Sequence, residues 1–303
     1  LCSHLGRPGG KKDGKFSLDV VAQRLSQILN QDVNFVEDCV GDKVLDAVEN
    51  LANGSVVLLE NVRFYSEETE NDLEFANTLG SFADVFVNDA FGAAHRSSPS
   101  LTGFTRKLPS VAGELMKREI DALTVAVENP PRPYVALFGG VKADDSLRVA
   151  INLLEKNIVD TVAFLGVVGN FMLMADGLDI GKSNADFARS QLEPFVDETT
   201  EMASQILSNY RDKIILPEDL AIELNGSRQP LSIQQLPTPH PIYDVGLSTL
   251  MGLRPIVMGA SCVLWNGPVS YFEKQNFAFG TIEVLNMCIE TDAMTIIGGG
   301  HTG

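Results

Sequence analysis

Arginine and histidine side chains recur in three loop-like segments of the first half of the chain. Arg7 lies in a glycine-rich segment with His4, Arg63 follows a short apolar run, and Arg96 follows another with His95 beside it. Guanidinium forks match the geometry of carboxylate and phosphate groups. Each arginine alone could be a solvated loop residue, but three at comparable positions in an otherwise acidic chain favour a pocket for an anion.

Glycine-rich segments follow apolar runs in the second half of the chain. They are residues 139–142 with Lys142, residues 166–169, residues 266–268 and residues 298–303. Glycine lets a backbone approach a phosphate closely, and a helix that starts there presents free N–H groups to it. One glycine pair alone is most simply a tight turn. Four such segments after successive strands favour a nucleotide site.

The elements that must position these residues alternate along the chain. Continuous apolar runs predict strands buried on both faces, at residues 56–59, 85–87, 134–138, 162–165, 214–216, 262–265 and 295–297. Helical spacing occupies residues 18–29, 72–82, 145–155 and 193–210. This alternation predicts an α/β fold: two Rossmann-like domains with parallel sheets flanked by helices. Such sheets bind ligands at the carboxyl ends of their strands.

A change of composition marks the predicted domain boundary. Residues 113–128 have helical spacing, and the proline-rich stretch 129–133 follows directly. Proline cannot continue a helix, and it pushes the residue before it toward extended geometry. We therefore expect a first domain at residues 1–112, an interdomain helix at 113–129 and a second domain at 130–303.

The composition limits the classes of partner. The chain has 303 residues, of which 40 are acidic and 23 basic, for a formal net charge of −17. This balance argues against a nucleic-acid binder and against a polybasic membrane anchor. No run approaches the ~18 apolar residues of a membrane span, and four cysteines without a C-x-x-C pair indicate reducing surroundings. We expect a cytoplasmic monomer with no nucleic-acid or membrane partner.

Other motifs leave further classes of protein open. Gly298, Gly300 and Gly303 match the dinucleotide fingerprint G-x-G-x-x-G, which would indicate an NAD-dependent oxidoreductase. A protein that keeps the fold but only binds its ligands is the other alternative. The sequence has no Walker-type phosphate loop, no H-E-x-x-H pair and no G-x-S-x-G elbow, so the corresponding chemistries lack support.

Taken together, the motifs resemble those of phosphoglycerate kinase, in that family's order and spacing and over nearly the whole chain. The segments that carry the resemblance are residues 3–8, 58–64, 87–91 with 95–96, 139–142, 265–268 with 272–273, and 298–300. Residues 142–146, 95–101 and 298–303 are similar to the archaeal branch of the family. The resemblance implies reversible phosphoryl transfer between 1,3-bisphosphoglycerate and ADP, giving 3-phosphoglycerate and ATP in glycolysis and gluconeogenesis.

The resemblance also implies roles for individual residues. The residues implied to bind the phosphoglycerate or the transferring group are His4, Arg7, Arg63, His95 and Arg96. Those implied to bind the nucleotide are Gly139, Gly140, Lys142, Asn266, Pro268, Glu273 (at the ribose), Gly298, Gly299, Gly300, His301 and Thr302. Arg7, Arg96, Gly299 and Gly300 would act in catalysis itself. Mg²⁺ would accompany ATP or ADP, and hinge bending would close the two domains around the substrates.

The sequence departs from the common family pattern at two functional positions. Ser146 stands where a second lysine is usual, and His301 stands where an aspartate usually meets the metal. The metal ligand is therefore unassigned, with Asp144 and Asp219 as the candidates. The chain also begins without Met and stops within a glycine run. We hypothesise a chain truncated at both ends, lacking an N-terminal strand and a C-terminal segment, and inactive by itself.

Overall fold

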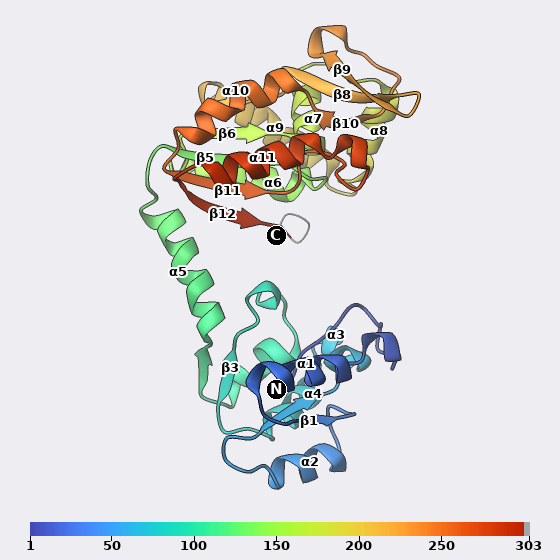
Figure 1. Cartoon of the computed structure of the whole chain (residues 1–303), viewed down its shortest axis with the longest axis vertical. Helices are drawn as coiled ribbons and strands as arrows, with labels where there is room; N and C mark the ends of the chain where they lie inside the picture. Colours follow the sequence, from blue (N-terminus) through green and yellow to red (C-terminus); the bar gives the residue numbers. More distant parts are fainter. Residues whose placement is uncertain (300–303) are drawn as a thin grey trace. The chain divides into compact units, whose positions relative to one another are not determined.

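A computed structural model describes residues 1–299, apart from the side chain of Arg106. The predicted site residues Gly300, His301 and Thr302 lie outside the described residues. The chain divides into two compact units, Leu1–Leu123 and Thr124–Gly303, which are both visible in Figure 1. The division falls within the helix α5 (Glu114–Glu128), the helix that the spacing of residues 113–128 predicts. The assignment of one substrate to each domain stays a prediction.

Unit 1 is built from short strands and helices. Its elements are α1 (Asp19–Leu29), β1 (Val33–Val36), α2 (Asp42–Glu49), β2 (Val56–Leu59), α3 (Glu67–Glu70), α4 (Leu73–Gly80), β3 (Phe86–Asn88) and β4 (Ser110–Ala112). Strands β1 and β2 pair in parallel, and so do β3 and β4. On the other edge of β2, the Leu1 amine donates to the Val57 carbonyl and the Leu59 N–H to the Leu1 carbonyl, in the pattern of a parallel pair.

Unit 2 contains a five-stranded parallel sheet in the order β12-β11-β5-β6-β7. Its strands are β5 (Tyr134–Phe138), β6 (Thr161–Phe164), β7 (Ile214–Ile215), β11 (Cys262–Asn266) and β12 (Met294–Gly298). Its helices are α6 (Ala143–Glu155), α7 (Gly166–Ala175), α8 (Lys182–Ser190), α9 (Val196–Asn209), α10 (Leu247–Met258) and α11 (Phe279–Glu290). Parallel strands flanked by helices confirm the predicted fold class.

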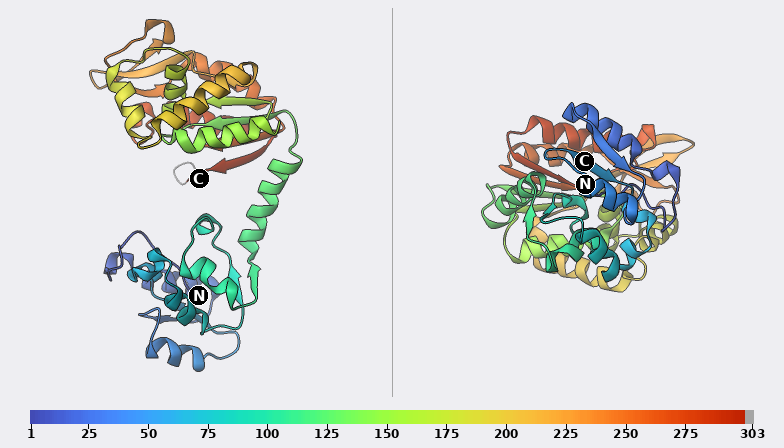
Figure 2. Two further views of the ribbon diagram at one scale, coloured as in Figure 1. Left: turned by 180° about the vertical axis from the view of Figure 1, so that it is seen from behind. Right: turned by 90° about the horizontal axis from the view of Figure 1, so that it is seen from below.

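The core of unit 2 explains why its strands read as continuous apolar runs. Successive side chains of a strand point to opposite faces of a sheet. On β5, Ala136 and Phe138 pack with helices α6, α7 and α9, whereas Val135 and Leu137 pack with α10 and α11. Figure 2 shows helices on both faces of this sheet. Both faces are therefore shielded from water, which is why every position along β5 carries a hydrophobic residue.

A small antiparallel sheet in unit 2 was not predicted from the sequence. Strands β8 (Asp219–Leu224), β9 (Ser227–Ser232) and β10 (Ile242–Val245) pair in the order β10-β8-β9. Asn225 and Gly226 form the turn between β8 and β9 with φ angles of 51° and 78°. Asn-Gly with both residues at positive φ is typical of a two-residue hairpin turn. An Asn-Gly dipeptide is therefore the local sequence signal that accompanies this hairpin.

Among residues 1–299, no helix combines the length and the apolar character that crossing a membrane requires.

Candidate active site

The cationic residues of unit 1 are held by the loop that follows β2. The Arg63 side chain is buried, and its Nη1 donates to the Gly6 carbonyl at 2.8 Å. Asn61 binds both of the segments that this contact joins. Its Nδ2 donates to the Leu5 carbonyl at 2.8 Å, and its Oδ1 accepts from the Arg63 N–H at 3.0 Å. The segment that carries His4 and Arg7 is thereby fixed against the segment that carries Arg63.

Electrostatic coupling shows that these cations form one group. Burial, Arg63 and Arg96 together lower the pKa of His4 below its ordinary 6.5, so His4 is neutral at pH 7. Burial, Arg96 and Arg7 lower the pKa of Arg63, while Glu68 opposes them. The structure therefore brings His4, Arg7, Arg63 and Arg96 together, which we call the cationic cluster. Because Arg7 and Arg96 each repel Arg63, a bound anion would be stabilised here.

His95 differs from its neighbours. It is exposed after the short helical turn Phe91–Ala93, and no interaction joins its side chain to the cationic cluster among the described residues. Its predicted role at the phosphoglycerate stays a prediction.

Two acidic residues that the sequence interpretation gave no role support the cluster. The buried Glu60 carboxylate accepts from Ser17 Oγ at 2.7 Å and from the Leu18 N–H at 2.9 Å. Glu68 is also buried, and it accepts from the Ser100 N–H at 3.1 Å. The charge of Glu68 favours the protonated form of Arg63 and so partly offsets the repulsion from the other arginines. Nothing in the local sequence distinguishes a buried glutamate from an exposed one, so only the fold reveals their roles.

In unit 2, the glycine segments meet at the carboxyl edge of the parallel sheet. Asn266 at the end of β11 lies in register with Phe138 of β5 and Gly298 of β12. The Gly139 N–H donates to the Asn266 carbonyl at 2.8 Å, and the Gly140 N–H donates to the Pro268 carbonyl at 2.6 Å. The structure thus brings together the residues predicted from three separate strand ends.

Close backbone approach is the reason why glycine occupies this edge. A Cβ on Gly139 would lie 2.5 Å from the Pro268 carbonyl oxygen, and one on Gly267 would lie 2.6 Å from the Gly139 carbonyl oxygen. Gly267 and Gly299 also have φ angles of 86° and 90°, which side chains with a Cβ rarely adopt. Backbone atoms consequently line much of the edge, beside the side chain of Asn266.

Lys142 is the charged group nearest to this glycine edge along the chain. It occupies the position before the first turn of α6 and is exposed. Its ammonium makes no ion pair with any residue of the described 1–299. An unpaired lysine beside a helix N-terminus can add a mobile positive charge to the N–H groups there.

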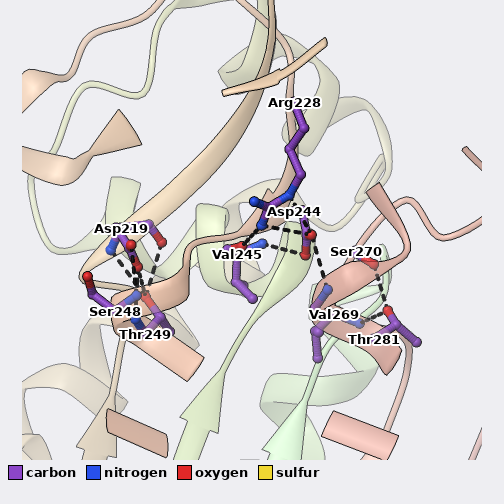
Figure 3. Close-up of polar contacts among 10 residues, drawn as sticks. Asp219, Arg228, Asp244, Val245, Ser248, Thr249, Val269, Ser270 and Thr281 are labelled. Atoms are coloured by element: carbon purple, nitrogen blue, oxygen red, sulfur yellow. Dashed lines mark hydrogen bonds and ion pairs between the residues drawn. The ribbon is translucent and has the colours of Figure 1, made fainter. Parts of the chain in front are cut away.

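Trp265 and Thr281 support the loop that follows β11, and the sequence interpretation missed both roles. The buried Trp265 donates from Nε1 to the Gly267 carbonyl at 2.8 Å. Thr281 Oγ1, from α11, accepts from the Val269 N–H at 3.2 Å and lies 2.7 Å from Ser270 Oγ (Figure 3). The loop that carries Pro268 is therefore fixed at both of its ends.

Asp219 is committed to a structural role and does not fit a metal ligand. Its carboxylate accepts from the Ser248 N–H at 2.9 Å and from the Thr249 N–H and Oγ1, each at 2.8 Å, at the start of α10 (Figure 3). Burial alone would raise the pKa of Asp219, but the hydrogen bonds from Thr249 and Ser248 outweigh burial and lower it. Both oxygens are therefore already used in the protein, which argues against Asp219 as a direct metal ligand and leaves Asp144 as the other candidate.

A buried ion pair links β9, β10 and α11. The Asp244 carboxylate accepts from Arg228 Nε at 3.2 Å, from the Val245 N–H at 2.8 Å and from the Gly280 N–H at 3.1 Å. Figure 3 shows Arg228 and Val245 at this carboxylate. Burial raises the pKa of Asp244 to about 6, although the Gly280 and Val245 N–H groups and Arg228 all favour the charged form.

Replacing Asp244 with asparagine is expected to remove a pH dependence of folding. Between its ordinary pKa of 3.8 and about 6, Asp244 ionises in the unfolded chain but stays protonated in the folded protein. The unaltered protein therefore loses stability as pH rises through this window, by no more than about 3 kcal/mol, and the loss is complete above pH 6. The amide of the asparagine variant titrates in neither state. Urea unfolding of both proteins at pH 4 to 7 measures the difference.

The matched control for that experiment is Asp212→Asn at an exposed position. Its free energy of unfolding should follow the same pH profile as the unaltered protein. Parallel profiles for Asp244→Asn and the unaltered protein would contradict the prediction.

The fold and these groups define the class of protein. Phosphoryl transfer demands positioning and charge neutralisation more than covalent chemistry from the protein. An α/β protein of two units, one with a cationic cluster and the other with a backbone-lined strand edge, has the groups of a nucleotide-dependent phosphotransferase.

Comparison with known proteins gives the particular family. The family model of phosphoglycerate kinase matches residues 1–303. The chain is 38% identical to phosphoglycerate kinase of Methanothermus fervidus over 309 residues, covering 99% of the chain and 74% of that relative. It is 40% identical over 309 residues to the enzyme of Borreliella burgdorferi, covering 100% of the chain and 76% of that relative.

Solved structures agree with the sequence comparisons. The crystal structure of phosphoglycerate kinase from Pyrococcus horikoshii matches with a TM-score of 0.86 and 34% identity, over 99% of this chain and 75% of that one. The enzyme from Coxiella burnetii matches with a TM-score of 0.77 and 33% identity, over the same shares of both chains. The chain belongs to the phosphoglycerate kinase family, whose members are phosphotransferases.

The relatives are longer than this chain, and the two compared by sequence are about equally similar to it. The chain spans about three quarters of the length of the relatives it matches. The identities of 38% and 40% to an archaeal and a bacterial relative are too similar to single out an archaeal branch.

Proposed function

We propose that this chain binds 3-phosphoglycerate at the cationic cluster of unit 1 and ADP or ATP at the glycine edge of unit 2. The reaction is reversible phosphoryl transfer from 1,3-bisphosphoglycerate to ADP. The observation that supports the proposal most is the meeting of Gly139, Asn266 and Gly298 at one strand edge, beside the unpaired Lys142. The Gly139 and Gly140 N–H groups already bind carbonyls of the β11 loop, so the groups offered to a diphosphate chain are the first N–H groups of α6 and the Lys142 ammonium.

The acid site rests on charge complementarity. 3-Phosphoglycerate carries a carboxylate and a phosphate, and the cationic cluster offers two exposed arginines, Arg7 and Arg96, around the buried Arg63. A neutral His4 can donate or accept one hydrogen bond without adding charge. The roles of these residues in binding, and of Arg7 and Arg96 in catalysis, are part of the proposal.

Mg²⁺ is proposed to enter with the nucleotide. Among the described residues, no group of three or more His, Cys, Asp or Glu side chains could hold a metal ion. Mg²⁺ binds mainly to nucleotide phosphates and water, so one or two carboxylates of the chain would be enough to hold it. Asp144, half-buried in the first turn of α6, is the nearest candidate ligand along the chain to Lys142. When bound, the metal supplies positive charge against the phosphates.

Ligand-induced stabilisation tests the proposal. MgADP and 3-phosphoglycerate should each raise the Tm of the unaltered chain, because both bind the folded state. Lys142→Met should remove most of the shift by MgADP and leave the shift by 3-phosphoglycerate. Lys156→Met, an exposed lysine at the other end of α6, is the matched control and should keep both shifts.

The same experiment separates the alternatives. A Tm shift with NAD alone would overturn the kinase proposal in favour of an oxidoreductase. Equal shifts in Lys142→Met and in the unaltered chain would overturn the assignment of Lys142. The hypothesis that the 303-residue chain is inactive by itself stays a prediction. A coupled assay of ATP-dependent turnover of 3-phosphoglycerate decides it.

A further inference from the structure

The segment that follows the β11 loop carries Glu273, the residue proposed to bind the nucleotide ribose. Glu273 is exposed, and its carboxylate pairs with no cation among the described residues. An exposed, unpaired glutamate is a poor acceptor unless its backbone is held in place, because ordering a free side chain costs entropy. What holds this backbone is therefore part of how the site works.

The neighbouring residue, Lys274, is the anchor of the segment. Its ammonium lies 2.5 Å from Glu223 Oε1 on β8, and both side chains are half-buried. The same ammonium lies 5.0 Å from the ring centre of Tyr243 and 5.6 Å from that of Phe277. A cation within about 6 Å of two aromatic rings and paired with a carboxylate has a single preferred position.

Backbone and ring contacts extend the anchor along the segment. The Tyr271 N–H donates to the Tyr243 carbonyl at 2.7 Å, and the Phe277 N–H donates to the Lys274 carbonyl at 2.7 Å. The rings of Tyr271 and Phe277 pack edge-on against Tyr243, with centres 5.3 and 5.2 Å away. Phe277 is completely buried. Glu273 thus lies between Tyr271 and Lys274, which both bind residues of the small antiparallel sheet.

The ion pair with Glu223 has a second consequence. An ammonium that reached the Glu273 carboxylate would occupy the group that the ribose needs. Glu223 holds the ammonium on the other side, at β8. The contact therefore both positions Glu273 and keeps it free to accept hydrogen bonds.

From these contacts we infer that Lys274 is a positioning residue for nucleotide binding: through Glu223 and the Tyr243 and Phe277 rings it presents Glu273 to the ribose hydroxyls. The inference rests on the proposed function, since it takes ADP or ATP as the ligand. It assigns a role to the small antiparallel sheet, which is otherwise remote from the glycine edge in sequence.

The test compares ADP with 2′,3′-dideoxy-ADP, which lacks the ribose hydroxyls. Dissociation constants for both, with Mg²⁺, are measured by calorimetry on the 303-residue chain. The unaltered chain should bind ADP about tenfold or more tightly than the dideoxy compound, as expected for hydrogen bonds to a charged group. Lys274→Met should reduce this ratio by about threefold or more, because Glu273 must then be ordered on binding.

Three further variants make the experiment decisive. Glu273→Ala should bring the ratio close to one. Glu223→Gln should lower the ratio as Lys274→Met does, and Lys274→Arg, which keeps the ion pair and the cation–π contacts, should restore most of it. Lys182→Met is the matched control, because it removes an exposed lysine paired with Asp186 on α8 and should leave the ratio unchanged.

The outcomes separate the inference from the proposed function. A normal ratio in Lys274→Met, with a lost ratio in Glu273→Ala, would overturn the inference and leave the proposed function standing. A parallel weakening of both ligands in Lys274→Met would show general destabilisation and would also overturn the inference. A normal ratio in Glu273→Ala, or no measurable ADP binding by the unaltered chain, would overturn the proposed nucleotide site itself.

Discussion

Replacing Arg63 with methionine is expected to weaken 3-phosphoglycerate binding by about 100-fold or more, the loss typical when one partner of a buried charge pair is removed. Arg63 is the only arginine of the cationic cluster that is buried, at 9% exposed, and its guanidinium is fixed by the Gly6 carbonyl at 2.8 Å. A phosphate or carboxylate that reaches it meets a donor already oriented and little screened by water.

The stability of the unliganded protein should change far less than its affinity. Methionine loses the hydrogen bond to Gly6, a cost of about 1 kcal/mol. It also removes a cation that Arg7 and Arg96 repel, since both lower the pKa of Arg63. These two effects oppose each other. A large loss of affinity with a small change in the free energy of unfolding is therefore the signature of a binding role.

Calorimetric titration of 3-phosphoglycerate measures the effect. Arg63→Lys keeps the positive charge but loses the planar set of donors of the guanidinium. We expect it to bind about tenfold more weakly than the unaltered protein, a smaller loss than that of Arg63→Met. Arg24→Met removes an exposed arginine of α1 whose side chain donates to Gln27, and it should bind normally. Unchanged affinity in Arg63→Met would contradict the acid site in unit 1.

Replacing Gly139 with alanine is expected to destabilise unit 2 by at least about 3 kcal/mol, at the upper end of overpacking effects. The new Cβ would lie 2.5 Å from the Pro268 carbonyl oxygen and 2.6 Å from that of Gly267. Both are backbone atoms, so neither can move aside as a flexible side chain would. Relief requires the ends of β5 and β11 to separate, which also breaks the Gly139 to Asn266 hydrogen bond of 2.8 Å.

Trp265 offers a direct measurement of this effect. It is the single tryptophan of the chain, it is buried, and it donates to the Gly267 carbonyl beside the substituted residue. Unfolding in urea followed by its fluorescence should show a lower midpoint for Gly139→Ala, together with a loss of stabilisation by MgADP.

Gly252→Ala is the matched control. Gly252 lies within α10, and apart from the adjoining residues of that helix no atom lies within 4 Å of the Cβ it would gain. Alanine is favoured over glycine in a helix by up to about 1 kcal/mol. This variant should therefore be as stable as the unaltered protein or slightly more so. An equal urea midpoint for Gly139→Ala and the unaltered protein would show that the strand ends are not in contact as described.

The strands were predictable because their environment is uniform. In β5 every side chain of Tyr134–Phe138 is buried, and the sequence there is apolar without interruption. The strand β2 (Val56–Leu59) was predicted with the same bounds for the same reason. The antiparallel sheet was missed because β9, with Pro230 and several exposed residues, carries neither an apolar run nor a clean alternation. Its Asn225-Gly226 turn was the one usable signal.

Site residues on strand ends were predictable in type but not in environment. Gly139, Asn266 and Gly298 follow apolar runs, and parallel pairing alone is enough to bring strand ends to one edge. The sequence could not show that Arg63 would be buried while Arg7 and Arg96 stay exposed. That difference depends on contacts of Asn61 and Arg63 with the segment of Leu5 and Gly6, which lies more than 50 positions earlier.

The sequence by itself determined the fold class, the family and the order of the phosphate-binding segments, because strand periodicity, glycine and proline positions and charge type are local properties of a chain. Only the tertiary structure decided that Asp219 accepts from the first N–H groups of α10, and that Lys274 pairs with Glu223, 51 residues earlier. Contacts of that kind join residues that lie far apart in the sequence, and no regular sequence pattern relates their positions. Their energies come from burial and geometry, which exist only after the chain has folded.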